Sequence, residues 1–342
     1  MHIDELLARR RALPPYDAAL WTFMERIAGR NLRNLADEGL QARLGAIDRN
    51  ILHLDDGSTP RDGLPPERGW LSPWWWLRAR HWTLLEFQHR DLAPQPTPSV
   101  PPMPAIRGEF RGVVAGGGKL LVRITRRDWA LDMLRAGRLR FAPAQSYSDA
   151  SLGAARADDE MAKSYRRPGQ VVSITGQGGE AIPALSDVTF TTRRSRERDG
   201  ALEDMPYWLL SFSSDLDPRL FSEFYGEDVA SAACVVVFDP MAMVRRALPH
   251  LCRAAPTSMK DLFPVEYRDP HHPEGRPSPL RCKDMVFALQ REMRFVLDPG
   301  GRFVLGGGEA LFVDAGSLAD IAAVYSPSGE RIAGSGPNTY LA

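Results

Sequence analysis

An α+β domain that follows a small helical region is the fold predicted by three features of the sequence. Apolar residues recur at helical spacing within residues 1–92, six of the twelve residues over 93–104 are proline, and short apolar strands prevail after residue 115. The prolines favour an extended backbone, as in a linker. Strands and helices do not alternate strictly beyond them, which argues against a doubly wound parallel sheet. We therefore predict a helical region over 1–92, a linker over 93–114 and an α+β domain over 115–342.

Three helices are predicted in the N-terminal region. Two of them place apolar residues three and four positions apart, at Leu20, Phe23, Met24, Ile27 and Ala28 and at Leu40, Leu44, Ile47, Ile51 and Leu52. A third begins at Ser72-Pro73, because serine suits an N-cap and proline the first helical position. It carries a run of large apolar side chains, Trp74, Trp75, Trp76, Trp82, Leu84, Leu85 and Phe87. Aromatics at this spacing are typical of a core or interdomain contact, and stacking on bases is the alternative.

The first part of the C-terminal domain predicts a strand, a helix and a second strand. Leu120–Ile124 is a short apolar strand, Thr125 caps the helix that follows, and Gly137 ends it. Leu139–Phe141 is the next strand. Residues 146–206 are polar and rich in turn formers, so we expect long loops with a few weak strands there.

The rest of the domain predicts further strands separated by short helices. Aspartate followed by proline suits a helix start, which sets two of the boundaries. In chain order we expect a strand over Tyr207–Ser213, a helix from Asp217-Pro218 to Gly226, a strand over Ala233–Phe238, a helix from Asp239-Pro240 to about Leu248, an extended segment over Val265–Arg268, and last strands over Leu289–Leu297 and Phe303–Val313.

Composition narrows the functional classes. Lys+Arg and Asp+Glu both total 43, so the chain lacks the overall basic charge typical of duplex-binding proteins. The chain has only three cysteines, and they lack C-x-x-C spacing, so no disulfide framework is expected. This usage is typical of a protein in a reducing compartment. The sequence shows neither the apolar core of a signal peptide nor an apolar run of the roughly 18 residues that span a membrane. We expect a cytoplasmic protein with no membrane partner, and delivery by a specialised secretion system stays open.

The predicted strand over residues 289–297 carries the side chains of most chemical interest. Because alternate residues of a strand share a face, Gln290, Glu292 and Arg294 are expected on one side and a mostly apolar set on the other. A carboxylate would then lie between an amide and a guanidinium. The solvated face of a half-buried strand is the alternative interpretation.

Two earlier strands add a cation and hydroxyl groups. Arg123 lies in an apolar strand, where a buried guanidinium needs a partner, and an edge position from which it reaches solvent is the alternative. Ser211 and Ser213 share one face of their strand. Together with Glu292, this arginine and these serines suit an anionic substrate that carries a sugar. The guanidinium of arginine binds two phosphate oxygens at once, and a carboxylate stabilises an oxocarbenium-like centre.

The chain over about 119–298 resembles a bacterial family of unknown activity, domain-of-unknown-function family 2971. The resemblance rests on ordered short motifs, namely Arg123, then Gly137, Leu139, Phe141 and Asp149, then Ser211-Phe212-Ser213, then Phe221 and Tyr225, and finally Gln290-Arg291-Glu292-Met293-Arg294. The chain departs from the pattern at Gln290, where the family often has glutamate, at Met293, where it has an aromatic residue, and in having no histidine shortly after Tyr225.

The Arg, Ser-x-Ser and Gln-x-Glu motifs are also similar, in the same order, to those of NAD-using ADP-ribosyltransferases. This resemblance implies a mixed, mainly antiparallel split β-sheet core with flanking helices, and it implies NAD as the substrate. It also implies that Arg123 grips the NAD diphosphate or ribose, that Ser211 supports the nicotinamide ribose and that Tyr225 stacks on nicotinamide.

The same resemblance implies that the late strand is catalytic. Glu292 would bind the ribose 2′-hydroxyl and stabilise the cation that forms as nicotinamide leaves, and Gln290 would orient the acceptor. Ser213 and Arg294 complete the expected NAD-binding set. No metal is expected, and no general acid is required because nicotinamide departs as a neutral molecule. A Gln-x-Glu pair implies an acceptor other than arginine.

The expected function is therefore that of an NAD-dependent ADP-ribosyltransferase or NAD glycohydrolase, in the setting of a toxin or a phage-defence effector. Its acceptor is a protein, a nucleic acid or water. A non-catalytic nucleic-acid- or protein-binding module on the same fold is the alternative, and the arginines within 193–198 are its main support. An NAD sensor without turnover is a third hypothesis. The N-terminal region would cap the cleft or contact a target or an antitoxin.

Two further motifs are not interpreted as sites. The glycine-rich run Gly116–Lys119 precedes a strand, whereas a phosphate-binding P-loop follows a strand and opens a helix. The pair His271-His272 lies in a proline-rich turn without nearby ligand spacing, which favours a surface loop over a metal site.

Overall fold

The computed structural model describes residues 15–27, 30–54, 71, 73–96, 100–101, 104, 110, 120–149, 158–176, 178–272 and 276–336. The chain divides into two compact units. Unit 1 comprises 1–100, 162–192 and 266–289, and unit 2 comprises 101–161, 193–265 and 290–342. One break falls inside the predicted linker. The segments 162–192 and 266–289, which the sequence places within the C-terminal domain, cluster instead with the N-terminal helices.

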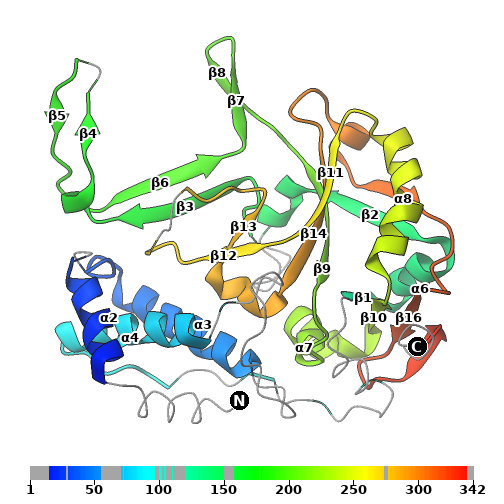
Figure 1. Cartoon of the computed structure of the whole chain (residues 1–342), viewed down its shortest axis with the longest axis horizontal. Helices are drawn as coiled ribbons and strands as arrows, with labels where there is room; N and C mark the ends of the chain where they lie inside the picture. The colour runs from blue at the N-terminus through cyan, green and yellow to red at the C-terminus, as the bar shows by residue number, and fades with distance from the viewer. Residues whose placement is uncertain are drawn as a thin grey trace. The chain divides into compact units, whose positions relative to one another are not determined.

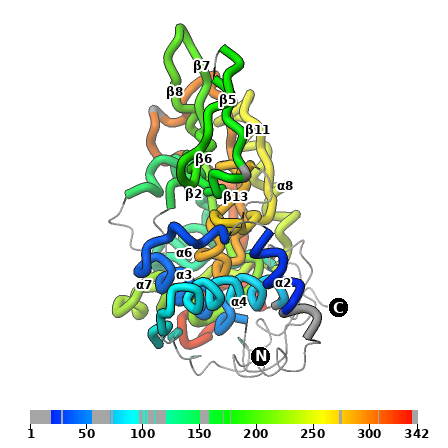
Figure 2. The backbone as a smooth tube through the Cα atoms, turned by 90° about the vertical axis from the view of Figure 1, so that its left-hand side faces the viewer, coloured from blue at the N-terminus to red at the C-terminus, as the bar shows by residue number. Residues whose placement is uncertain are grey.

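The described helices of unit 1 are α2 (Pro15–Ile27), α3 (Asp37–His53) and α4 (Pro73–His89). Helix α4 packs against both α2 and α3 (Figures 1 and 2). The apolar face of α3 is buried as predicted, and so are Trp76 and Trp82 of α4. Helix α2 differs, because Phe23 and Ile27 in its apolar stripe are 58% and 66% exposed. The proposed cap Ser72 lies outside the described residues.

The later segments of unit 1 form short two-stranded ladders. The expected long loops over 146–206 therefore contain more paired strands than the sequence predicts. The pairs in unit 1 are β3 (Ala162–Arg167) with β6 (Val188–Arg193), β4 (Ile174–Thr175) with β5 (Ala181–Ile182), and β12 (Glu266–Arg268) parallel to β13 (Cys282–Asp284).

A buried ion pair fastens the segment 266–289 to α3. Arg43 donates two hydrogen bonds to the carboxylate of Asp269, at 2.7 and 2.6 Å. His272 stacks on Trp82 with ring centroids 4.2 Å apart, and the Asn31 amide nitrogen lies 2.9 Å from its Nδ1. The two histidines predicted for a surface loop are thus partly buried, and His272 is covered by Trp82 of α4.

Unit 2 is built on a nine-stranded sheet in which the described strand pairs are antiparallel. This confirms the predicted α+β class with a mainly antiparallel sheet. The main strand order is β11 (Met259–Pro264), β14 (Glu292–Asp298), β9 (Trp208–Ser213), β1 (Leu121–Arg126), β10 (Ala232–Val237), β16 (Ala322–Tyr325) and β17 (Arg331–Gly334).

Strand β9 changes its partner along its length, so the sheet forks. At its start, Trp208 and Leu209 pair with β2 (Arg138–Pro143), which in turn pairs with β15 (Leu311–Asp314). At its end, Ser213 pairs with Val122 of β1, and this is the single residue pair that joins β1 to β9. The connection from β1 to β2 runs through helix α6 (Arg127–Ala136). We call the gap between β1 and β2 beside β9 the fork.

Helices cover both faces of the β1 region of the sheet (Figure 1). Buried residues of α6 and α8 (Pro240–Ala254) form one core with apolar residues such as Leu210, Phe212 and Val235. Phe221 of α7 (Arg219–Tyr225) packs on the opposite face, among Val122, Val236 and their neighbours. Neither these helices nor any other described helix is long and apolar enough to cross a lipid bilayer.

Unit 2 also contains a β-hairpin and 3₁₀ turns. Strands β7 (Ser195–Arg198) and β8 (Ala201–Asp204) form the hairpin. The 3₁₀ segments of the whole chain are η2 (Ala144–Ser148), η4 (Gly169–Val171), η5 (Gly226–Ser231), η6 (Met285–Gln290) and η7 (Leu305–Gly308).

Several predicted boundaries are wrong. Thr125 does not cap α6, because β1 stays paired with β10 as far as Arg126 and the helix begins only after it. The strand predicted from residue 289 begins at Glu292, and Gln290 belongs to η6. The predicted last strands are not the last, since β16 and β17 follow them and β16 is entirely buried.

Candidate active site at the fork of the sheet

Arg123 lies where the sheet forks. Its strand neighbours Leu121 and Val122 are buried, but its own side chain is only partly buried because β1 leaves β9 after a single residue pair. The guanidinium Nη1 donates a 2.6 Å hydrogen bond to the backbone oxygen of Ser211. Ser211 lies in the stretch of β9 between its pairings with β2 and β1, so this carbonyl is available to a side chain.

Ser211 and Glu292 meet on the other face of β9. The register places Ser211 opposite Arg294 and Ser213 opposite Glu292, so these four side chains share one face of the sheet. The hydroxyl of Ser211 donates a 2.6 Å hydrogen bond to Glu292 Oε1, and Arg294 Nε donates a second to the same oxygen at 3.0 Å. Glu292 is 3% exposed. Arg123, Ser211 and Glu292 therefore belong to one cluster, linked through Ser211.

A second carboxylate completes the network around Arg294. The fully buried guanidinium contacts both oxygens of Glu160, at 3.0 and 2.9 Å. Burial alone would lower the pKa of Arg294, but the carboxylates of Glu160 and Glu292 outweigh it and raise that pKa well above its usual value. The hydroxyl of Tyr207 donates to the backbone oxygen of Glu160 at 3.0 Å. Arg294, predicted to bind NAD, is thus enclosed by protein groups and fixes the position of Glu292.

Tyr147 interacts electrostatically with both Arg123 and the carboxylates of the cluster. It lies in η2, directly after β2, and is half-buried. Burial raises the pKa of its phenol, the nearby Arg123 and Arg140 oppose that rise, and the carboxylates of Glu292 and Glu160 add to it. The hydroxyl therefore stays protonated at neutral pH and is able to donate a hydrogen bond.

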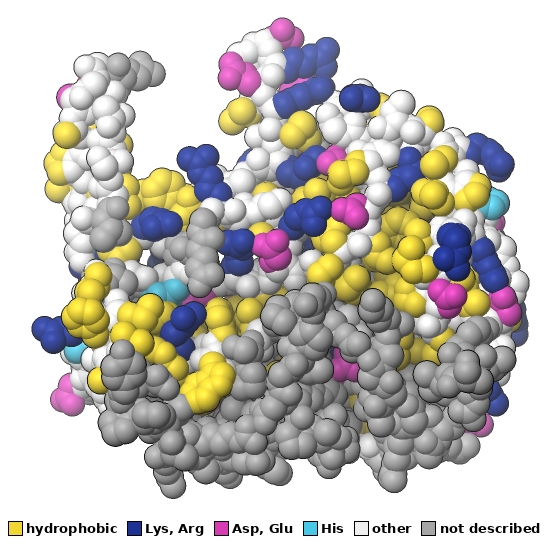
Figure 3. Space-filling view, viewed as in Figure 1, with side chains coloured by type: hydrophobic (Ala, Val, Ile, Leu, Met, Phe, Trp, Pro, Cys, Tyr) yellow, Lys and Arg dark blue, Asp and Glu magenta, His cyan; other side chains and the backbone are white. Residues whose placement is uncertain are grey.

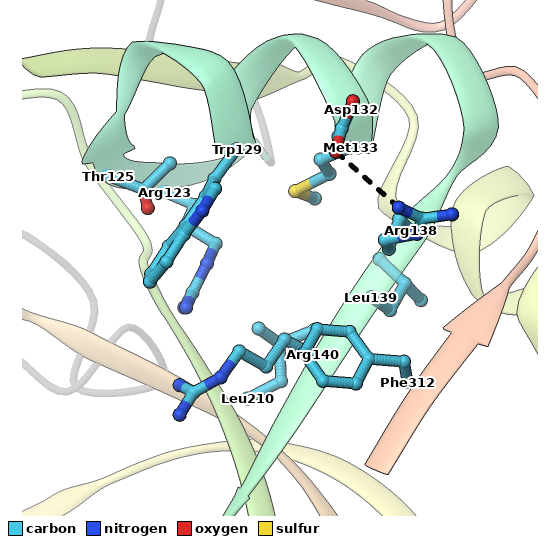
Figure 4. A pocket seen from close by; sticks show the side chains of 10 residues that line it. All are labelled: Arg123, Thr125, Trp129, Asp132, Met133, Arg138, Leu139, Arg140, Leu210 and Phe312. Carbon is cyan, nitrogen blue, oxygen red and sulfur yellow. Dashed lines mark ion pairs between the residues drawn. The ribbon is translucent and has the colours of Figure 1, made fainter. Parts of the chain in front are cut away.

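A pocket of about 210 Å³ opens at the fork, and Arg123 belongs to its wall. Thr125 of β1, Trp129 and Met133 of α6, and Leu210 of β9 form much of its lining (Figure 4). Further residues of β2 and β15 complete it, namely Arg138, Leu139, Arg140 and Phe312, together with Asp132 of α6. Arg123 thus touches both this pocket and the Ser211 carbonyl.

The other predicted site residues take different places. Gln290 is buried in η6, and Arg291 has a positive φ of 48°, which breaks the alternation that would have set Gln290 beside Glu292. Ser213 is buried and pairs with Glu292 across the two strands. Tyr225 ends α7 and packs against the apolar cluster that contains Val122. It is therefore part of a packed helix end on the face of β1 opposite to Arg123.

The arginine-rich run proposed to contact an anionic partner is neutralised within the β7–β8 region. Arg193 forms hydrogen bonds with Asp204 and Arg196 with Glu203 across the hairpin, and Arg194 binds Asp298 at 2.8 Å. Figure 3 shows both signs of charge gathered at this hairpin. These carboxylates reduce the attraction of this segment for a nucleic acid.

Four residues of this region were not identified from the sequence. Glu160 and Tyr147 lie within or beside the polar stretch that predicts loops, so no periodic pattern marks them. Trp129 is 54% exposed on α6, and that is a usable signal, since an aromatic residue on the polar side of an amphipathic helix is unusual. Arg140 alternates with the apolar Leu139 and Phe141, which are both buried, and so it had to lie on the opposite face of β2.

The geometry defines what the cluster is able to do. A buried carboxylate held by a hydroxyl and a guanidinium supplies a fixed negative charge, which stabilises a developing cation without reorganisation. A neutral phenol and an arginine beside it supply hydrogen-bond donors for anionic or hydroxylated parts of a ligand.

Comparison with known proteins gave no match to any family model, to any curated protein or to any solved structure. The resemblances described from the sequence motifs therefore stay predictions.

Proposed function

We propose that the protein cleaves the N-glycosidic bond of NAD and transfers ADP-ribose to water or to a macromolecule, with Glu292 as the catalytic carboxylate. The observation that carries the proposal is the 2.6 Å hydrogen bond between Ser211 and Glu292, in a cluster that also receives Arg123. Arg123 reaches the backbone oxygen of Ser211, and the Ser211 hydroxyl binds Glu292, so Ser211 links residues of three strands in the chain order that NAD-using ADP-ribosyltransferases share.

Cleavage of this bond requires a negative charge near ribose C1′, but it does not require a proton donor for the leaving group. The bond between ribose C1′ and the pyridinium nitrogen breaks, and its electron pair returns to the nitrogen, so nicotinamide leaves as a neutral molecule. The positive charge develops on C1′ and the ring oxygen, where a carboxylate stabilises it. A lone pair of the acceptor then bonds to C1′, and the acceptor loses its proton; with water the products are ADP-ribose and H⁺.

The residues around Glu292 suit that role. Ser211 and Arg294 both donate to Oε1, which orients the carboxylate. Tyr147 is a neutral donor near the same carboxylate, and Arg123 is placed to meet a phosphate. Gln290, buried in η6, is not proposed as the residue that orients the acceptor.

Nicotinamide release from NAD, measured by chromatography, tests the proposal. We expect release by the wild-type protein and a loss of roughly 10²- to 10³-fold in Glu292→Gln, the size seen when a fixed group opposite a developing charge is removed. Glu309→Gln is the matched control, because Glu309 is an exposed glutamate of the same unit, and its rate should equal that of the wild type.

Two outcomes would contradict the proposal. One is the absence of nicotinamide release by the wild-type protein, and the other is equal release by wild type and Glu292→Gln. Thermal stabilisation by NAD without release would instead indicate an NAD sensor. Circular dichroism of each variant separates a catalytic loss from a failure to fold.

A further inference from the structure

The pocket at the fork has the composition of a ligand site in its own right. Trp129 and Phe312 are 54% and 56% exposed, although aromatic side chains of this size are usually buried. Both line the same pocket, Trp129 from α6 and Phe312 from β15 (Figure 4). Leu210 and Met133 form an apolar part of the wall. A flat aromatic group is the natural occupant of such a space.

The charges around the pocket favour a ligand that also carries an anion. Asp132 and Asp314 both pair with Arg138, at 3.6 and 3.1 Å, so the charge of this arginine is compensated. Arg140 forms no ion pair with any carboxylate among the residues that the structure describes, and its Cζ lies 5.9 Å from the centre of the Trp129 ring. A guanidinium held beside an indole is positioned for an anionic group on a ligand whose ring stacks on that indole.

Arg123 places a second guanidinium on the same wall. Its Nη1 donates to the backbone carbonyl of Ser211, and its side chain also lines the pocket. Arg123 and Arg140 are also the two cations that act on Tyr147. Both arginines line the pocket, which therefore contains two guanidinium groups of the kind that bind phosphate.

We infer that this pocket binds the base and the phosphate of a nucleotide 5′-phosphate, with the base against Trp129 and Phe312 and the phosphate at Arg140 and Arg123. Aromatic side chains stack on any base, and arginine forks match phosphate oxygens. The binding site does not depend on Glu292 being catalytic. That it holds the adenylate half of NAD, with the glycosidic bond on the Glu292 side of Arg123, rests on the proposed function.

Calorimetric titration with AMP, adenosine and ribose 5-phosphate tests the inference, because each probe carries a different part of the ligand. We expect AMP to bind most tightly. Trp129→Ala should weaken AMP and adenosine by about tenfold or more, the size of one lost base stack, and leave ribose 5-phosphate unchanged. Arg140→Gln should weaken AMP and ribose 5-phosphate by a similar factor and leave adenosine unchanged.

Two matched controls separate the pocket from general effects. Arg138→Gln removes an arginine of the same pocket whose charge is already compensated, so AMP affinity should change far less than in Arg140→Gln. Trp74→Ala removes a tryptophan of similar exposure, 49%, from unit 1 and should have no effect. Trp129→Phe should retain most of the AMP affinity, because an aromatic ring remains.

The results decide the inference separately from the proposed function. AMP binding that is lost in Trp129→Ala and Arg140→Gln supports the nucleotide site even if NAD is never cleaved. An absence of AMP binding to the folded wild-type protein overturns it, and so does equal affinity in Trp129→Ala, Arg140→Gln and the controls. Nicotinamide release that AMP does not inhibit would support the proposed function and reject this pocket as the adenylate half of its site.

Discussion

Arg294 is a fully buried charged residue of unit 2. Its fully buried guanidinium contacts Glu160 and Glu292, which are 1% and 3% exposed. Removing one partner from such a set leaves buried charge without compensation, which typically costs about 3–5 kcal/mol. We therefore expect Arg294→Met to lower the free energy of unfolding by roughly that amount in urea denaturation.

A surface pair and a second substitution provide the controls for Arg294→Met. Arg193→Met breaks an ion pair whose side chains are about half exposed, and it should change stability little. Adding Glu160→Gln to Arg294→Met removes one of the stranded charges and should restore part of the loss. If Arg294→Met is no more destabilising than Arg193→Met, the buried network is not what holds Glu292 in place.

The residue scale also shows where strand alternation predicts a site and where it fails. Alternation correctly places Ser211 on the same face as Ser213, and Glu292 on the same face as Arg294, because each pair lies inside a paired strand. The register between the two strands, which the sequence does not predict, brings all four to one face. Alternation fails at Gln290, because Arg291 adopts a left-handed backbone conformation that arginine rarely takes. Nothing in the local sequence marks that turn, since neither glycine nor asparagine is present.

Gly137 shows how one residue terminates an element. It has φ of 64° directly after α6, the left-handed C-cap that the sequence predicts. A Cβ at this position would lie 2.1 Å from the backbone oxygen of Gly316, which is too close for any side chain. We expect Gly137→Ala to lower the melting temperature and to cost roughly 2–3 kcal/mol, from the backbone conformation and the clash together.

Gly300 is a close control, because its φ of 61° is near that of Gly137, but a Cβ there would meet no atom within 4 Å. Gly300→Ala should therefore cost only the backbone part, about 1–2 kcal/mol. Equal losses at the two glycines, measured by thermal unfolding, would show that the contact with Gly316 is not tight.

At the scale of elements, the sequence predicts well what local patterns determine. Helix α8 begins at Pro240 with Asp239 as its cap, and the Asp239 side chain accepts a 2.8 Å hydrogen bond from the backbone nitrogen of Ala242. Strand β16 was missed because it has only four residues and lies within a stretch rich in alanine. The fork was also not predictable from residue patterns, since it depends on which strands pair with β9.

At the scale of the whole molecule, unit 1 should be sensitive to acid. Burial lowers the pKa of His272 to about 4, and the positive charge of Arg43 also lowers it; burial and Arg43 lower that of His271 to about 4 as well. Both imidazoles bind a proton more readily in the unfolded chain. Their neutral forms therefore stabilise the fold fully above about pH 6.5, and this stability is lost as the pH falls toward about 4.

Asp269 acts in the same direction at lower pH. Burial would raise its pKa, but Arg43 and the two histidines outweigh burial and hold that pKa well below its usual value. A carboxyl group of this kind stabilises the fold above its unfolded pKa of about 4 and loses that contribution as the pH falls further. Both effects therefore weaken unit 1 on acidification.

Urea unfolding at pH 7.5 and pH 5 measures this dependence. We expect wild-type protein to be less stable at pH 5 by roughly 1–3 kcal/mol, the scale of a pKa shift of one to two units. His272→Phe keeps a ring that stacks on Trp82 but cannot bind a proton, so the difference between the two pH values should shrink. An unchanged difference would mean that other groups cause it.

Each unit is built from separate segments of the chain, so the ribosome makes parts of the two units alternately. Residues 1–100 leave the ribosome first, but the last strand of unit 1, β13, and its neighbours up to Leu289 are made after most of unit 2. Glu292 follows three residues later. The carboxylate proposed for catalysis is thus absent until Arg123, Glu160 and Ser211 have been made, and Arg294 follows it by two residues. A chain that ends at residue 289 would therefore contain all of unit 1 but lack the carboxylate that binds Ser211, and under the proposed function it would be inactive.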